Sequence, residues 1–324
     1  MTSSSGARPL KMGLRAALSC LILTSALYAN EAQSFHRAYK AMAYVTFFGV
    51  TVFSRSDVGF GAAEEDESVA ENGRTIHLQF LSGSKPERAH GLNRFGFIEE
   101  KITGKNSELL RSEYFGLITA NREESLGEAR AALGAKAGDK TQYVAAQATL
   151  AGTRAEFAIR HVILPLPREP VAAMAMVRQF QKQFRDLVPN GAQDRDSTVT
   201  ISSLHTFLYM LVQAIGSTAP SIDNQFVYNS KPYGLHLDRK LDEKTGGDLV
   251  KLGMMKSAKQ AMRLNGTLEN AKGERTVFAL WYEQGAANPL PLRFEFRPRS
   301  YLHLVFDAVP ETGASSLEKE LAWR

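Results

Sequence analysis

The sequence predicts an α+β fold: a curved, largely antiparallel β-sheet with a helical middle segment of about three helices packed against it. Runs in which apolar and polar residues alternate, as in a half-buried strand, occur early and again late in the chain. Runs with an apolar residue at every third or fourth position lie between them, roughly within residues 106–217. Residues 30–324 contain no repeat and no Pro- or Ser-rich linker, so we expect a single domain.

The closing segment, residues 274–307, predicts a β-meander. It contains three strand-like runs separated by turn residues. In the middle run four apolar residues, from Leu290 to Phe296, alternate with polar ones, which predicts one apolar and one polar face. The first run is apolar on both faces, so Trp281 is expected to be buried.

Further strands are predicted where β-branched and aromatic residues cluster. Residues 41–61 predict a strand pair, or one strand bent at Gly49, and the acidic run 64–67 predicts a solvated hairpin tip. The other expected strands are 74–81, 92–104, 154–164, 226–237, 248–255 and 261–270.

Helices are predicted at 122–134, 169–189 and 202–216. Pro170 suits the first turn of the second helix, and Ser202 or Ser203 can cap the third. Residues 314–324 predict a short amphipathic helix or a loose tail.

The first 29 residues have the form of a secretory signal peptide, with a retained N-terminal anchor as the alternative. Three basic residues accompany a short apolar run that ends in small residues. The only cysteine, Cys20, lies inside this run, so the mature chain would contain no cysteine. Without the leader's three positive charges the formal charge of +5 becomes +2 (5 − 3), which gives no general attraction to nucleic acid.

No pattern of catalytic, cofactor-binding or metal-binding residues emerges, so we assign none and expect no cofactor. No two histidines are spaced four apart, and none accompanies a cysteine. The sequence Ser82–Gly83–Ser84 lacks the spacing of a nucleophile elbow. Glu99 and Glu100 are neighbours on an expected strand, so they should point to opposite faces.

Four arginines near the closing meander form the one candidate site. Arg275, Arg293, Arg297 and Arg299 can present a positive face to an anionic partner. The alternative is a solvated outer face on which Glu295 neutralises its neighbours.

Three segments resemble parts of secreted or periplasmic β-rich bacterial proteins of unknown function. They are WYEQGAANPLPLRFEFRPRSYLHLVFD, FVYNSKPYGLHL and AHGLNRFGFIEE. The resemblance covers about a third of the chain and implies a β-rich envelope protein, with no functional residue to transfer.

Together these observations predict a secreted or periplasmic, non-enzymatic binding or carrier protein. Its ligand would be apolar or its partner a lipid or other envelope component, and we expect no nucleic acid and no membrane span in the mature chain. The alternative is a hydrolase with dispersed catalytic residues. An apolar cavity would favour the carrier, whereas converging histidine and carboxylate side chains would favour the enzyme.

The leader gives the first testable prediction. We expect the mature protein to begin between Leu27 and Glu31, because Ala26 and Ala29 follow the apolar run. N-terminal sequencing of exported protein checks this, and a chain that still starts at Met1 or Thr2 would contradict it.

Overall fold

The computed structural model describes residues 32–47, 50–70, 73–89, 93–105, 108–120, 140–165, 170–299 and 302–310. The expected signal peptide, the helix expected at 122–134 and the ending expected at 314–324 lie outside these residues.

In the described residues one antiparallel sheet of 14 strands dominates the fold, which confirms the predicted class. The strands lie in the order β8-β7-β6-β5-β4-β3-β2-β1-β14-β13-β12-β11-β10-β9. The first strand, β1, pairs with the last, β14, and so joins the half of the sheet formed by β1 to β8 to the half formed by β9 to β14. Among the described residues the sheet is not closed, because β8 and β9 are its two edge strands. The bounds are β1 Ala32–Phe47, β2 Val50–Ala70, β3 Gly73–Ser84, β4 Phe95–Lys105, β5 Glu108–Thr119, β6 Lys140–Ala151, β7 Arg154–Pro165, β8 Arg195–Thr200, β9 Ser221–Tyr228, β10 Lys231–Leu241, β11 Ala261–Asn270, β12 Arg275–Glu283, β13 Arg293–Arg299 and β14 Leu302–Ala308.

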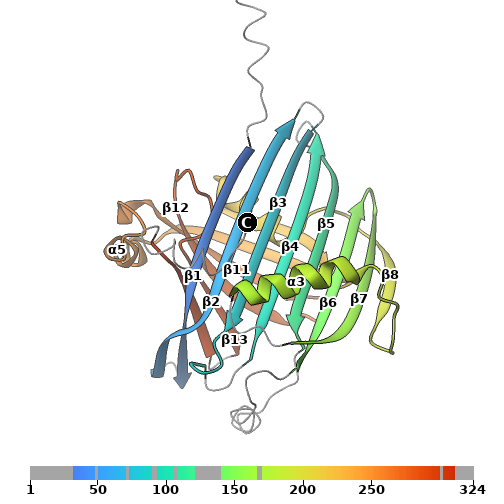
Figure 1. Cartoon of the computed structure of the whole chain (residues 1–324). Coiled ribbons are helices and arrows are strands. Elements are labelled where there is room, and N and C mark those ends of the chain that lie inside the picture. Colours follow the sequence, from blue (N-terminus) through green and yellow to red (C-terminus); the bar gives the residue numbers. More distant parts are fainter. Residues whose placement is uncertain are drawn as a thin grey trace, which may run out of the picture.

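The sheet curves, so that β11 to β13 lie behind β1 to β5 (Figure 1). Helix α3 (Pro170–Phe184) crosses the front strands, and the face that it covers is called the outer face. The apolar stripe predicted for this helix is confirmed, because Ala173, Val177, Phe180 and Phe184 are buried against the sheet. The helix ends at Phe184, earlier than the expected Pro189.

Helix α4 (Phe207–Gly216) lies on the opposite, inner face, between the two halves of the sheet. On one side it packs against Ile76, Leu78 and Ile102 of β3 and β4. On the other side it packs against residues of β9 to β12, including Leu264 and Leu280. An apolar helix in this position fills the space that the curvature creates.

Glu100 of β4 binds the start of α4. Its carboxylate accepts hydrogen bonds from the Thr206 hydroxyl at 2.5 Å and from the backbone N–H groups of Leu208 and Tyr209 at 2.9 Å. The expected cap at Ser202 or Ser203 is therefore wrong: the helix begins at Phe207, and a side chain from a distant strand satisfies its free N–H groups. Burial raises the pKa of Glu100 to about 7, although these donors act to lower it.

Glu99 points to the outer face, which confirms that the two neighbours diverge. Its carboxylate lies 3.0 Å from His77 Nε2 and accepts a hydrogen bond from the Gln181 amide of α3 at 2.8 Å. The two glutamates therefore bond to different helices on opposite faces of one strand.

The strand expected at 248–255 is wrong: helix α5 (Glu243–Lys251) covers its first half, and the short helix η2 (Ala258–Gln260) follows it. Asp242 caps α5 by accepting from the backbone N–H of Thr245 at 3.1 Å. The same carboxylate accepts from the indole N–H of Trp281 at 2.9 Å. Trp281 is 2% exposed, so its predicted burial is confirmed.

Two other expectations are wrong. Residues 106–217 are not mainly helical: where described, they contain β5 to β8 as well as α3 and α4. The acidic run 64–67 is no hairpin tip, since it lies inside β2 and its side chains alternate between the faces. Glu65 and Glu67, two positions apart, share the inner face: Glu67 bonds to Arg74 of β3, and Glu65 is 5% exposed.

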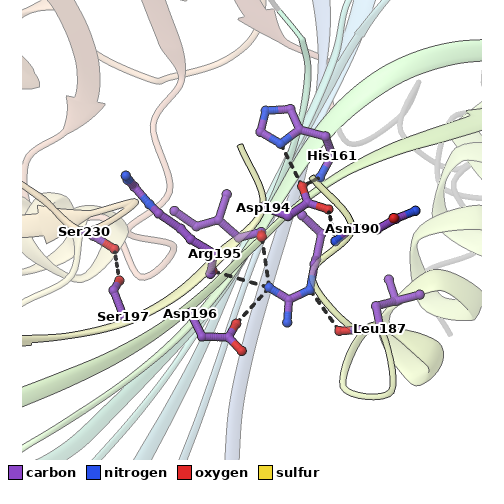
Figure 2. A network of polar contacts seen from close by, with 10 residues as sticks. His161, Leu187, Asn190, Asp194, Arg195, Asp196, Ser197 and Ser230 are labelled. Atoms are coloured by element: carbon purple, nitrogen blue, oxygen red, sulfur yellow. Dashed lines mark hydrogen bonds and ion pairs between the residues drawn. The ribbon is translucent and has the colours of Figure 1, made fainter. Parts of the chain in front are cut away.

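A polar network fixes the loop before the edge strand β8 (Figure 2). The buried guanidinium of Arg160 donates to the carbonyl of Leu187 at 2.9 Å and to the carboxylate of Asp196 at 2.8 Å. Asp194 accepts from the backbone N–H of His161 at 2.6 Å. Across the opening of the sheet, the Ser197 hydroxyl meets that of Ser230, in the β9–β10 turn, at 2.7 Å.

Two glutamates buried on the inner face, Glu65 and Glu100, give a paired prediction. Burial, followed by the charge of Glu67, raises the pKa of Glu65 to about 7, and its Oε2 atom is buried without a hydrogen-bond partner among the described residues. Because the pKa of Glu65 is raised in the folded state, the protonated side chain contributes fully to stability below its ordinary pKa of 4.5. This contribution is lost as pH rises through about 7 and the buried carboxyl group loses its proton. Glu65→Gln should therefore raise the free energy of unfolding at pH 8 by roughly 1 kcal/mol.

Glu100→Gln should instead lower the free energy of unfolding. The NH₂ group of the glutamine replaces an accepting oxygen of the carboxylate, which leaves at least one buried donor at the start of α4 unsatisfied. We expect a loss of about 1–3 kcal/mol. Denaturant melts at pH 5 and pH 8 measure both variants, with Glu99→Gln as the outer-face control. Equal shifts of the same sign for the two inward glutamates would contradict their different environments.

Candidate functional site

A polar hollow of about 260 Å³ opens on the outer face where β13, β14 and β1 run side by side. Its lining residues are Tyr44, Thr51, Arg293, Glu295, His303 and Val305. The volume is below the roughly 300–1,000 Å³ typical of sites for whole small molecules, so the hollow suits one small group.

Strand register brings these residues together. Tyr44 of β1 pairs with His303 of β14, and Glu295 of β13 pairs with Val305. Side chains directly opposite each other on paired strands share a face. The hollow therefore depends on the pairing of the first strand with the last.

Arg293 forms one side of the hollow and is held by an ion pair. Its Nε and Nη2 atoms donate to the two carboxylate oxygens of Asp307, at 2.5 and 3.1 Å, and each side chain is 14% exposed. Burial disfavours the charged guanidinium, but the bonds to Asp307 and its charge raise the pKa of Arg293 above its ordinary value. This two-point contact fixes the plane of the guanidinium.

His303 and Glu295 form a second pair. The Nε2 atom of His303 lies 3.0 Å from a carboxylate oxygen of Glu295. The ring of Tyr44 lies beside the imidazole, with 5.8 Å between ring centroids. A carboxylate in this position orients the imidazole ring.

The structure separates the four predicted arginines. Arg293 contributes to the hollow, and Arg297, on the same strand and face, is exposed. Arg275 lies on β12 and bonds to Glu269 of β11 at 2.6 Å. Arg299 lies at the end of β13, with its side chain outside the described part of the chain.

Sequence reasoning missed Asp307, Tyr44 and Thr51. Asp307 had a signal: in YLHLVFD it alternates onto the face of His303, and an antiparallel β13–β14 pair can place it opposite Arg293. Tyr44 and Thr51 had none, because nothing local predicts that β1 pairs with β14.

Among the described residues, no group of three or more His, Cys, Asp and Glu is arranged to hold a metal ion. In the same part of the chain, every helix is too short or too polar to span a membrane.

Comparisons with known proteins place the chain in no family. No family model matches the sequence, and no curated protein matches it. Among solved structures, the chain is similar to a protein described as "Beta-barrel-like Protein of Domain of Unknown Function DUF1849 from Brucella abortus". The two share 9% identity with a TM-score of 0.39, over 85% of this chain and 95% of that one.

The ion pair predicts unequal roles for two arginines on one face. Arg293→Gln should lower the free energy of unfolding by about 1.5–3 kcal/mol, because it leaves Asp307 partly buried without its cation. Arg297→Gln should change it by less than about 0.5 kcal/mol, as for other surface substitutions.

Denaturant melts of both variants check this prediction. The double variant Arg293→Gln/Asp307→Asn should recover part of the loss, since neither charge is then left alone. Equal, small effects of Arg293→Gln and Arg297→Gln would show that the ion pair does not stabilise the fold.

Proposed function

We propose that the protein is an exported, non-enzymatic binding protein whose outer hollow receives a hydroxyl-rich group, such as a sugar residue, of an envelope component. The observation that carries the proposal is the lining of the hollow. An ion pair, Arg293 with Asp307, and a hydrogen-bonded pair, His303 with Glu295, present fixed donors and acceptors.

A hydroxyl group suits this lining better than an anion. A hydroxyl both donates and accepts, so it can bond to Glu295 and to Arg293 or His303 at once. An anion would meet the carboxylate of Glu295 in the lining, and the guanidinium of Arg293 is already bonded to the carboxylate of Asp307. The aromatic ring of Tyr44 adds an apolar surface for the C–H groups of a sugar ring.

The proposed location depends on the leader rather than on the fold. Residues 1–29 have the basic, apolar and small-residue order of a secretory signal peptide. Export would place the hollow among periplasmic or extracellular components, where hydroxyl-rich groups are abundant.

An apolar carrier would need a different site from this hollow. The hollow is lined mainly by polar residues, and α4 packs in the apolar space on the inner face. The sequence suggested either an apolar ligand or an envelope component, and the geometry therefore favours an envelope component bound through a polar group.

A hydrolase is the second candidate, because a histidine and a carboxylate do converge in the hollow. Glu295 can orient His303 as a general base, and Thr51 and Tyr44 supply hydroxyl groups. Hydrolysis of p-nitrophenyl acetate that is abolished in His303→Ala, but retained in Tyr44→Phe, would favour this candidate.

The binding proposal is tested by saturation-transfer NMR with glucose, galactose and N-acetylglucosamine. We expect transfer from the mature protein to at least one sugar, with affinity at least about tenfold lower in His303→Ala and in Tyr44→Ala. His236→Ala is the matched control, because His236 is an exposed histidine of β10 bonded to Asp223 and Asp238.

Vesicles that carry a glycolipid with the same sugar distinguish a membrane source from a free glycan. No transfer to any of the sugars, or unchanged transfer in His303→Ala, would contradict the proposal. Binding of inorganic phosphate that is lost in Arg293→Gln/Arg297→Gln would favour an anionic partner on this face instead.

A further inference from the structure

An asparagine that is followed by a glycine can change its own side chain without an enzyme. The backbone nitrogen of the glycine attacks the side-chain carbonyl carbon of the asparagine, and a C–N bond forms. The NH₂ group leaves as ammonia and takes the proton of the glycine N–H with it. Water then opens the succinimide ring at either carbonyl carbon, which gives aspartate or isoaspartate. Glycine favours the reaction because it has no Cβ in the way and its backbone turns freely.

The chain contains three Asn–Gly pairs, and two of them lie in opposite surroundings. Asn190 and Gly191 lie in the loop between α3 and β8, and both are exposed. Asn265 and Gly266 lie inside β11, which pairs with β10 on one side and with β12 on the other. The third pair, residues 72–73, lies partly outside the described residues.

The backbone of Gly191 is free to react. Nothing lies within 4 Å of the position that a Cβ would occupy at this residue. Its carbonyl accepts from the backbone N–H of Asp194 at 3.1 Å, whereas its own N–H has no hydrogen-bond partner among the described residues. The attacking nitrogen can therefore turn toward the side chain of Asn190 without breaking a hydrogen bond.

The backbone of Gly266 is held in place. This residue is buried, and the ring of Phe278 from β12 lies directly over its Cα, where a Cβ would clash with the ring. Neighbouring strands on both sides keep Asn265 and Gly266 extended. The pair in β11 is therefore a matched internal control with the same two residue types.

We propose that Asn190 is a modification site, at which the folded protein converts slowly and in one direction to aspartate and isoaspartate. Water is the only other reactant. The site is independent of the proposed sugar binding, because its loop precedes the edge strand β8, whereas the hollow lies on β13, β14 and β1.

The products would disturb the loop beside the edge strand. Asp194 accepts from the backbone N–H of Asn190 at 3.2 Å, and it also bonds to the backbone and the imidazole of His161 at 2.6 and 3.0 Å (Figure 2). A new carboxylate beside Asp194 is unfavourable, because like charges repel each other. Isoaspartate also adds a carbon atom to the backbone. We therefore expect the contacts of Asp194 to weaken and the start of β8 to loosen.

Peptide mapping by mass spectrometry, after incubation of the folded protein at pH 8, tests the proposal. Asn190 should lose its amide at least about tenfold faster than Asn265, because a central strand must open before Gly266 can react. In guanidinium chloride, which unfolds the chain, the two rates should become similar. At pH 5 the change at Asn190 should be slower, since the attacking nitrogen must lose its proton.

Three variants separate the reaction from its effect on the loop. Gly191→Ala keeps Asn190, and the open space at this position accommodates the methyl group, so the variant should fold but react severalfold more slowly. Asn190→Asp has the charge of one product and should speed amide hydrogen exchange at the start of β8. Asn190→Gln stays uncharged and should leave this exchange unchanged.

Equal rates at Asn190 and Asn265 in the folded protein would overturn the proposal. So would a rate at Asn190 that is about tenfold or more lower in the folded than in the unfolded chain, because the fold would then protect this site. Unchanged hydrogen exchange at β8 in Asn190→Asp would contradict the expected effect on the edge strand.

Discussion

The contact between Glu100 and the start of α4 is the interaction on which the rest of the structure depends. An apolar helix lies between the two halves of a curved sheet, and its first N–H groups need acceptors in a place that water does not reach. A carboxylate from β4 supplies them. Because the helix also packs against β9 to β12, this one contact links halves of the sheet that are far apart in its strand order.

Because α4 fills the inner face, the outer face is left to provide the binding surface. The pairing of β1 with β14 brings Tyr44 beside His303 and Val45 beside Leu302. The same junction thus forms the polar hollow. The ion pair between Arg293 and Asp307 stiffens the wall of the hollow.

Local patterns predicted the parts of the fold that local chemistry decides. The meander and the buried Trp281 followed from alternation, and the stripe of α3 followed from its helical period. The start of α4 could not be predicted, because its cap comes from a glutamate more than 100 positions earlier. The acidic run of β2 was misjudged because composition suggested solvent, whereas alternation turns Glu65 inward.

The sequence predicted part of the candidate site, as it predicted part of the fold. The polar face of β13 gave Arg293 and Arg297, but not the ion pair that engages one of them. Asp307 was within reach of a register argument, since β13 and β14 are consecutive. Tyr44 and Thr51 were not, because they reach the site through a pairing that spans nearly the whole chain.

Amide hydrogen exchange at the start of α4 tests the central role of Glu100 most directly. If its buried carboxylate holds the helix between the halves of the sheet, the amides of Leu208 and Tyr209 should exchange as slowly as those of the core strands β4 and β12. Exchange of these two amides at the rate of exposed turns, while the strands stay protected, would show that the helix start opens independently and contradict the account.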